Sequence, residues 1–142
     1  MSAVPSVLFV CGRNAIRSPM AEALWIRHFG AAADARSCGV IPAAFVDPFM
    51  ISVMWEVDCD LEDFSPIALA GIGEPTPQIV VSLSPAADRM AKAYADESDA
   101  EFLAWPAPDP SGAQGNRDQR LMAYRESRDA IQAMIENWEK TR

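Results

Sequence analysis

The sequence predicts a single-domain α/β protein, a three-layer sandwich in which a parallel sheet of about four strands carries helices on both faces. Two patterns support this prediction. Short apolar runs without alternating polar residues are typical of strands that are buried on both faces, as in parallel sheets. Helical segments alternate with these runs, which favours right-handed crossover connections. The length of 142 residues fits one domain, expected to span residues 1–142.

The chain begins with a strand, a loop and a helix. Val7–Val10 is the first apolar run, and Cys11–Arg17 is the loop that follows it. Ser18-Pro19 then predicts an N-cap and a first-turn proline for a helix that stops at Gly30.

The middle of the chain adds a strand and two helical segments. Ala35–Val40 is expected to form the second strand. Asp47-Pro48 predicts the start of a helix that reaches Glu56, and Pro66–Ala70 is expected to form a shorter helical piece.

Two further strands follow. Gln78–Leu83 is another apolar strand, Ser84-Pro85 is expected to cap a helix running to about Tyr94, and Glu101–Ala104 is a short last strand. The segment Trp105–Asn116 is too rich in proline and glycine for a regular element, and a loop of this length in a compact domain is usually functional or disordered.

A long helix is predicted over Arg117–Glu139. Several of its apolar residues recur at helical spacing and are expected to face the core: Leu121, Tyr124, Ile131, Ile135 and Trp138. Trp25 and Trp55 are also expected in the core or at an interface.

Composition excludes several functional classes. Twelve Lys and Arg against twenty Asp and Glu give a formal net charge of -8, which argues against general nucleic-acid binding and against binding to anionic membranes. No signal peptide or membrane-spanning segment is apparent. The three cysteines lack metal-ligand spacing and indicate reduced thiols, so a cytoplasmic location is expected.

The loop after the first strand carries the chemistry. Cys11 ends a buried strand, Arg17 follows six residues later, and a helix begins next, an arrangement that predicts an anion cradle of loop N–H groups and the positive helix end. The planar fork of Arg17 suits two phosphate oxygens. The same surroundings favour the thiolate form of Cys11, which is a nucleophile beside the bound oxyanion. The alternative is a buried apolar Cys11 and a surface Arg17.

The stretch from Val7 to Ala23, Val-Leu-Phe-Val-Cys-x-x-Asn-x-x-Arg-Ser-Pro-Met-Ala-Glu-Ala, resembles the opening of the low-molecular-weight protein tyrosine phosphatases and of the arsenate reductases that share their fold. The resemblance continues through Arg36-Ser37-Cys38-Gly39 and Asp109-Pro110. It implies a flavodoxin-like strand order 2-1-3-4 and a hydrolysis of phosphate monoesters that uses no metal and no cofactor.

The resemblance also implies residue roles. Cys11 attacks phosphorus and forms a cysteinyl-phosphate intermediate, Arg17 and the loop amides hold the phosphate oxygens, and Asp109 protonates the leaving group and later activates water. Asn14 matches a residue that holds the loop, and Ser18 matches a hydroxyl that supports the thiolate. The expected substrate-binding residues are Gly12, Arg13, Asn14, Ala15, Ile16 and Ser18.

The position of Asp109 in the sequence supports a catalytic role independently of the resemblance. It lies between two prolines in the long loop after the last strand, at the sheet edge where Cys11 also lies, and could close over the nucleophile. The alternative is a turn-forming aspartate.

Three positions depart from the family pattern. Arg13 stands where the family commonly has glycine, which predicts a shifted turn or a strained Arg13. Ile16 replaces a second loop cysteine, so no disulfide with an adjacent thiol can protect Cys11. Ser111 replaces a tyrosine that walls the phosphotyrosine ring, and three aromatic residues are candidates for that wall instead: Phe45, Phe49 and Trp105.

The resulting prediction is a cysteine-dependent phosphatase that acts on phosphotyrosine or another aryl phosphate, in a phosphorylated protein or a small phosphomonoester, as a monomer or weak dimer. An arsenate reductase is the first alternative, with Cys38 or Cys59 as a resolving thiol, although residues 82–86 hold none. A non-catalytic oxyanion-binding regulatory module is the second. The single histidine, His28, is expected to be a capping or surface residue.

Overall fold

The computed structural model describes residues 4–142 and contains four strands, four α-helices and three short 3-10 helices within them. In chain order the elements are β1 (Val7–Cys11), α1 (Arg17–Phe29), η1 (Gly30–Ala32), β2 (Ala35–Gly39), α2 (Pro48–Trp55), η2 (Leu69–Gly71), β3 (Ile79–Ser82), α3 (Pro85–Glu97), β4 (Glu101–Ala104), η3 (Pro110–Gly112) and α4 (Arg117–Lys140).

The strands form one parallel sheet in the order β2-β1-β3-β4, which confirms the predicted architecture and strand order. β1 is central, and its last residue, Cys11, is in register with Gly39 at the end of β2. All four strands run in the same direction, so their carboxyl ends open toward one edge of the sheet. In α/β proteins, ligands bind at this edge.

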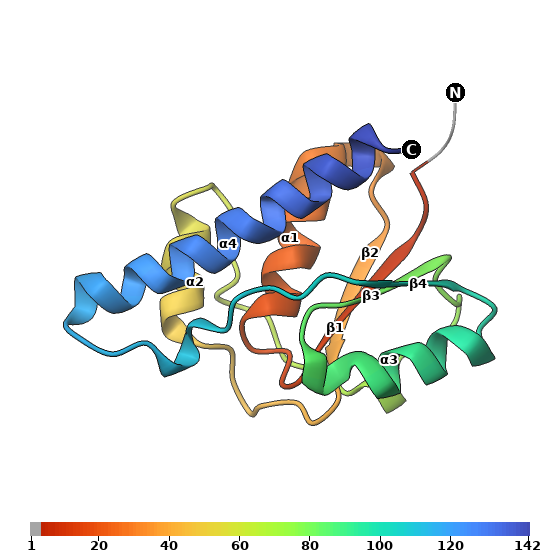
Figure 1. Ribbon diagram of the computed structural model, residues 1–142, viewed down its shortest axis with the longest axis horizontal. Coiled ribbons are helices and arrows are strands. Elements are labelled where there is room, and N and C mark those ends of the chain that lie inside the picture. Colours follow the sequence, from red (N-terminus) through yellow and green to blue (C-terminus); the bar gives the residue numbers. More distant parts are fainter. Residues whose placement is uncertain (1–3) are drawn as a thin grey trace.

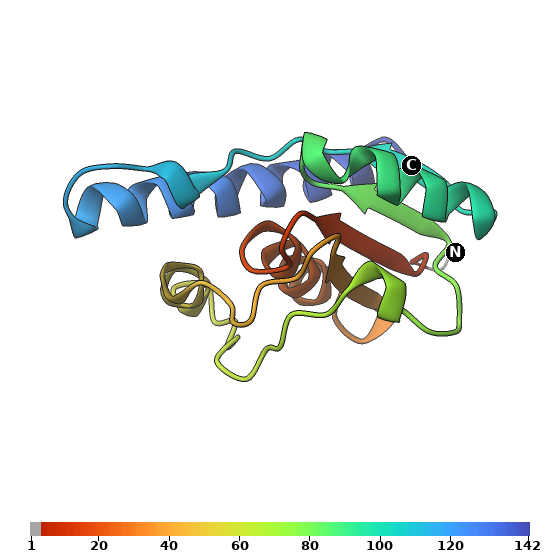
Figure 2. The same cartoon turned by 90° about the horizontal axis from the view of Figure 1, so that it is seen from below.

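Helices cover both faces of the sheet (Figures 1 and 2). Phe9 on β1 packs into a core that α1, α2 and α4 share, whereas Leu8 and Val10 point into the core under α3. Side chains on both faces of β1 are buried. The sequence of this strand is therefore a continuous apolar run, as expected for a central parallel strand. The loop after β4 runs alongside α4 in both views.

The predicted N-cap of the first helix is wrong. α1 begins at Arg17, the N-cap position is Ile16, and no side chain caps the helix there. The Ser18 hydroxyl is already within the first turn and bonds to groups of the preceding loop instead.

The predicted helical piece at Pro66–Ala70 is also wrong over most of its length. The backbone at Ala68 is extended and forms a β-bridge with Gly39, and only Leu69–Gly71 is helical, as a 3-10 turn. Gly39 N–H donates to the Ile67 carbonyl (2.9 Å). Pairing with the end of β2 therefore overrides the local proline signal.

Two smaller expectations need correction. α3 continues past Tyr94 to Glu97, because Ala95 extends the buried stripe that Ala87 and Ala91 begin. Trp55 is 60% exposed and lies outside the core, so only an interface position stays a prediction for it, whereas Trp25 is 1% exposed. No helix between residues 4 and 142 is both long and apolar enough to cross a membrane.

Candidate active site

The loop at residues 11–18 is tied to the segment that follows β2. Four of its carbonyl groups accept hydrogen bonds from main-chain N–H groups of residues 40–47: Cys11 from Val40 (3.1 Å), Gly12 from Ile41 (2.9 Å), Arg13 from Ala43 (2.8 Å) and Ala15 from Asp47 (3.1 Å). The carbonyl groups of the loop are thus directed away from the interior of the loop.

The N–H groups of the same loop are left free. In the described part of the chain, six of them (residues 12, 13 and 15–18) donate to no protein group, and five of these residues line one pocket: Gly12, Arg13, Ala15, Ile16 and Arg17. α1 begins at Arg17, so the positive, N-terminal end of this helix lies at the same loop. Free main-chain N–H groups at a helix N-terminus are a general arrangement for binding phosphate and similar anions.

Cys11 lies at the base of this loop and is 3% exposed. Its Sγ is 3.0 Å from the Ser18 hydroxyl and accepts a hydrogen bond from Asn14 N–H at 3.3 Å. The Ser18 oxygen accepts from Asn14 Nδ2 (2.7 Å), which leaves its single proton for Cys11 Sγ or for the Cys38 carbonyl (3.3 Å). Two hydrogen-bond donors, the Ser18 hydroxyl and Asn14 N–H, therefore lie within reach of the sulfur.

Asn14 provides the sharp turn of the loop. Its φ is 53°, and it is completely buried. Its side chain donates to Ser18 and Ser37 and accepts from Ile67 N–H (2.9 Å). The expected strained backbone at Arg13 is not found, because the left-handed position falls on the next residue, Asn14, and asparagine tolerates a positive φ.

Gly39 is a site residue whose role sequence reasoning missed. A Cβ atom on Gly39 would lie 2.7 Å from the carbonyl carbon of Arg13 and 2.8 Å from the Asn14 nitrogen. Only glycine lets β2 approach the 11–18 loop this closely. One signal in the sequence could have indicated this role. A glycine ends the second predicted strand, which pairs with the strand that ends in Cys11.

Asp109 lies on the opposite wall of the pocket, and the Arg17 side chain reaches toward it from the 11–18 loop. Arg17 Nη1 donates to the Ala107 carbonyl (3.1 Å), and Nη2 is 3.8 Å from Asp109 Oδ2. Asp109 Oδ1 accepts from the N–H (3.0 Å) and hydroxyl (2.7 Å) of Ser111. Partial burial acts to raise the pKa of Asp109, but the Ser111 hydrogen bonds and the Arg17 charge outweigh it and hold that pKa below its ordinary value.

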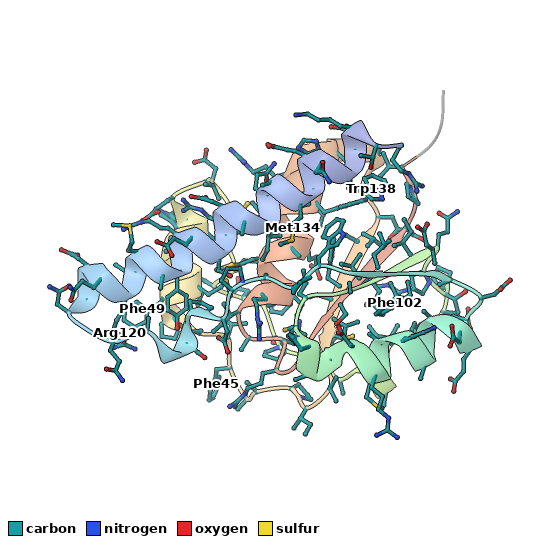
Figure 3. All side chains as sticks on the ribbon, viewed as in Figure 1. Phe45, Phe49, Phe102, Arg120, Met134 and Trp138 are labelled. Atoms are coloured by element: carbon teal, nitrogen blue, oxygen red, sulfur yellow. The ribbon has the colours of Figure 1, made fainter. Side chains whose placement is uncertain are left out.

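The pocket has a volume of about 520 Å³ and brings the 11–18 loop together with three other segments. Phe45 is on its rim and is 83% exposed, projecting from the segment after β2 (Figure 3). Phe49 and Trp105 do not line it. Phe49 packs against Tyr124 and has the Arg120 guanidinium over its ring, 4.5 Å from the centroid, and Trp105 packs against Phe9.

A family model for low molecular weight phosphotyrosine protein phosphatases matches residues 6–141. The chain belongs to this family. Its members are cysteine-dependent enzymes with this single-sheet α/β fold, which binds phosphate oxyanions.

Relatives within the family have two kinds of name. An arsenate reductase of Halalkalibacterium halodurans is 27% identical over 135 residues (95% of each chain), and a glutaredoxin arsenate reductase of Synechocystis sp. is 29% identical over 132 residues (92% of this chain and 93% of that one). A solved arsenate reductase in the phosphate binding state has a TM-score of 0.79, with 26% identity over 95% of this chain and 96% of that one. A low molecular weight protein tyrosine phosphatase of T. tengcongensis has a TM-score of 0.75 at 22% identity (98% of this chain and 100% of that one) and shows the shared fold.

The other two thiols, Cys38 and Cys59, are both affected by burial, and Cys38 also lies on the other face of the sheet from Cys11. Cys38 is 0% exposed and packs in the core under α3, whereas Cys11 packs in the core on the other face of the sheet. Burial, together with the nearby Cys11, raises the pKa of Cys38 to about 12 despite the charge of Arg36. Burial also raises the pKa of Cys59. Both thiols are therefore held in the protonated, weakly nucleophilic form.

Two further pocket residues were expected only to have structural roles. Asp47 caps α2 through Phe49 N–H (2.8 Å) and accepts from the Tyr124 hydroxyl (2.7 Å) while its own N–H binds the 11–18 loop. Ser84, at the start of α3, also lines the pocket. His28 is at the end of α1, where its Nε2 is 2.8 Å from Glu139, away from the residues that line the pocket.

Proposed function

We propose that this protein is a phosphatase that hydrolyses phosphate monoesters through a cysteinyl-phosphate intermediate. The observation that carries the proposal is the carboxyl group of Asp109, which lines the same pocket as Cys11 and lies 3.8 Å from Arg17. An ester oxygen is a poor leaving group unless it receives a proton, and a carboxyl group beside the bound phosphate can supply that proton.

In the first step, Cys11 Sγ attacks phosphorus, the S–P bond forms and the bond to the ester oxygen breaks. Asp109 gives its proton to that oxygen. The free N–H groups of Gly12, Arg13, Ala15 and Ile16, with the Arg17 guanidinium, hold the phosphoryl oxygens, and this preorganised set of donors stabilises the charge that develops on them.

In the second step, the Asp109 carboxylate takes a proton from water, and the oxygen of that water attacks phosphorus. The S–P bond breaks, inorganic phosphate forms and the electron pair returns to Cys11 as thiolate. The Ser18 hydroxyl, 3.0 Å from the sulfur and held by Asn14, stabilises this leaving group.

The proposed substrates are phosphotyrosine and other aryl phosphates, in a phosphorylated protein or in a small molecule. The exposed ring of Phe45 on the pocket rim offers an apolar surface to an aryl leaving group. Ser111, which replaces the tyrosine of the phosphotyrosine-hydrolysing relatives, bonds to Asp109 and supplies no ring.

Arsenate reduction is the second candidate, because both curated relatives are named arsenate reductases. Release of arsenite from an arsenylated Cys11 requires a thiol that attacks the sulfur and forms a disulfide. Burial raises the pKa of both Cys38 and Cys59 and keeps these thiols protonated, so we expect that thiol to come from a separate molecule such as glutathione or a small redox protein. Arsenate-dependent oxidation of such a thiol would favour this candidate.

The test is steady-state hydrolysis of p-nitrophenyl phosphate without added metal. Cys11→Ser is expected to abolish turnover, and Asp109→Ala to lower kcat by roughly 10²–10⁴. Cys59→Ser and Asp118→Ala are the matched controls and should retain wild-type activity. A folded wild-type protein that binds phosphate but releases no p-nitrophenol would refute the phosphatase proposal and favour the regulatory module, or the reductase if arsenate consumes thiol.

A further inference from the structure

A buried hydroxyl group without a partner lies in the active-site pocket. Between residues 4 and 142, three buried side-chain polar atoms have no hydrogen-bond partner: Trp25 Nε1, Ser84 Oγ and Gln132 Oε1. Of these three residues, only Ser84 lines the pocket that contains Cys11. Ser84 is 2% exposed. Buried hydroxyl groups are nearly always bonded, so an unbonded one in a pocket calls for an explanation.

Ser84 lines the same pocket as Cys11 and Asp109, and the main chain just before it is bonded to the segments that carry both residues. The N–H of the preceding residue, Leu83, donates to the Val10 carbonyl (2.9 Å), and Val10 directly precedes Cys11. The Leu83 carbonyl accepts from Ala107 N–H (3.1 Å), two residues before Asp109. The residue before Ser84 is thus bonded to the segment that leads into Cys11 and to the segment that leads into Asp109.

The hydroxyl is also free of its usual local role. Ser84 is the N-cap residue of α3, a helix of 13 residues, but its side chain makes no capping bond. Ser84 and Ala86 both line the pocket, so the positive end of α3 adds to that of α1 there. This local field favours an anion beside the Ser84 hydroxyl.

Ser82, two residues earlier, provides a contrast within the same segment. It is 1% exposed, and its hydroxyl lies 2.6 Å from Asp88 Oδ1 and 3.0 Å from the Ser84 carbonyl. Ser82 is therefore satisfied inside the protein, whereas Ser84 is satisfied by none of the described residues.

We propose that Ser84 is a further substrate-binding residue, whose hydroxyl donates a hydrogen bond to an oxygen of the phosphoryl group held by the 11–18 loop. The proposal rests on the proposed function, because it adds a donor to the same oxyanion. The Ser84 hydroxyl breaks no protein hydrogen bond when phosphate binds. The hydrogen bond that it donates to the phosphate therefore adds to the affinity without an opposing loss. The same contact supports the cysteinyl-phosphate, which carries the same oxygens.

Calorimetric titration of the full-length protein with inorganic phosphate tests this without any turnover. Ser84→Ala is expected to raise the Kd for phosphate roughly five- to tenfold, the effect of one hydrogen bond to a charged group. Its unliganded Tm should equal or exceed that of the wild type, because no bond of the free protein is lost. Ser82→Ala is the matched control, expected to lower Tm and leave the phosphate Kd near the wild-type value.

An unchanged phosphate Kd in Ser84→Ala would overturn the proposal. A higher Kd accompanied by a lower unliganded Tm would also overturn it, because the hydroxyl would then support the fold rather than the anion. Absence of phosphate binding to the wild type would remove its basis. Binding without hydrolysis of p-nitrophenyl phosphate refutes only the phosphatase function, so the two failures are distinguishable.

Discussion

The two walls of the active-site pocket are held in different ways. The 11–18 loop has four carbonyl groups bonded to residues 40–47 and a completely buried Asn14 that bonds to three neighbours. The proline-rich loop, residues 105–116, presents an Asp109 side chain that is 53% exposed and bonds mainly within its own loop. One wall is thus fixed by the core and the other is attached at a few points.

This difference matches what each wall does in the proposed reaction. The 11–18 loop meets the same tetrahedral group in every step, so a rigid set of donors serves it throughout. Asp109 meets a leaving group that varies between substrates and then a water molecule. A carboxylate on an exposed loop can adjust to both, at the cost of weaker positioning.

The largest effect is expected from disturbing the fixed wall at Gly39. Gly39→Ala places a Cβ atom against the main chain of Arg13 and Asn14, at 2.7 and 2.8 Å, so the 11–18 loop must move. We expect kcat/KM for p-nitrophenyl phosphate to fall by about 100-fold or more. The free energy of unfolding is expected to fall by roughly 1–3 kcal/mol, which urea titration measures.

Gly71→Ala is the matched control, since a Cβ atom there meets no atom within 4 Å. It should change kcat/KM by less than about twofold and the free energy of unfolding by less than about 0.5 kcal/mol. Wild-type activity in Gly39→Ala would show that the 11–18 loop tolerates displacement, and the contrast between the two walls would lose its basis.

The fixed wall was also the part that the sequence predicted best. A buried strand that ends in Cys11, followed by Arg17 and a helix, carries its geometry in consecutive residues, so the loop and its position at the sheet edge follow from local pattern. Asp47 and Ser84 come to the pocket from separate segments, and Gly39 packs against the 11–18 loop from a third. Their spacing to Cys11 along the chain carries no periodic signal, and only the folded sheet brings them together.

Ser18 shows a second limit of local reasoning. Its position before a proline predicts an N-cap. In the structure its buried hydroxyl instead makes hydrogen bonds with Cys11 and Asn14. The bridge of Ala68 with Gly39 overrides the helical signal of Pro66 in a similar manner. In both places tertiary hydrogen bonds outweigh a local preference of about 1 kcal/mol.

An intermediate effect is expected where the proline-rich loop is attached to α4. The Ser127 hydroxyl is completely buried and donates to the Pro108 carbonyl (2.8 Å), next to Asp109. Ser127→Ala removes this attachment, which is expected to lower kcat roughly five- to tenfold and stability by about 1 kcal/mol. The inhibition constant of inorganic phosphate should not change, because the 11–18 loop is untouched.

Ser98→Ala, at the C-terminal end of α3, is the control for a serine outside the pocket. A rise in the phosphate inhibition constant of Ser127→Ala that equals its loss in kcat would mean that α4 supports the whole pocket. The two walls would then not be held independently.

The smallest effect is expected within the proline-rich loop, from the Ser111 hydroxyl that bonds to Asp109. Partial burial acts to raise the pKa of Asp109. The two Ser111 hydrogen bonds and the Arg17 charge act in the opposite direction and together have the larger effect, so the pKa is lowered. Ser111→Ala removes one of the lowering contacts, so the pKa of Asp109 rises. A general acid works only when protonated, so the basic limb of the kcat profile is expected to move to higher pH.

On that limb, the rate of Ser111→Ala should exceed the wild-type rate by about twofold, while the rates at the acidic end coincide. In the free enzyme the Ser111 hydrogen bonds and, to a smaller extent, the Arg17 charge outweigh partial burial and keep the pKa of Asp109 low. A bound phosphate dianion engages the Arg17 guanidinium and repels the carboxylate, which raises the pKa of Asp109 in the complex. The basic limb of kcat should therefore lie at higher pH than that of kcat/KM in both proteins. Coincident limbs would mean that Asp109 does not sense the bound phosphate, and its role as the proton donor would fail.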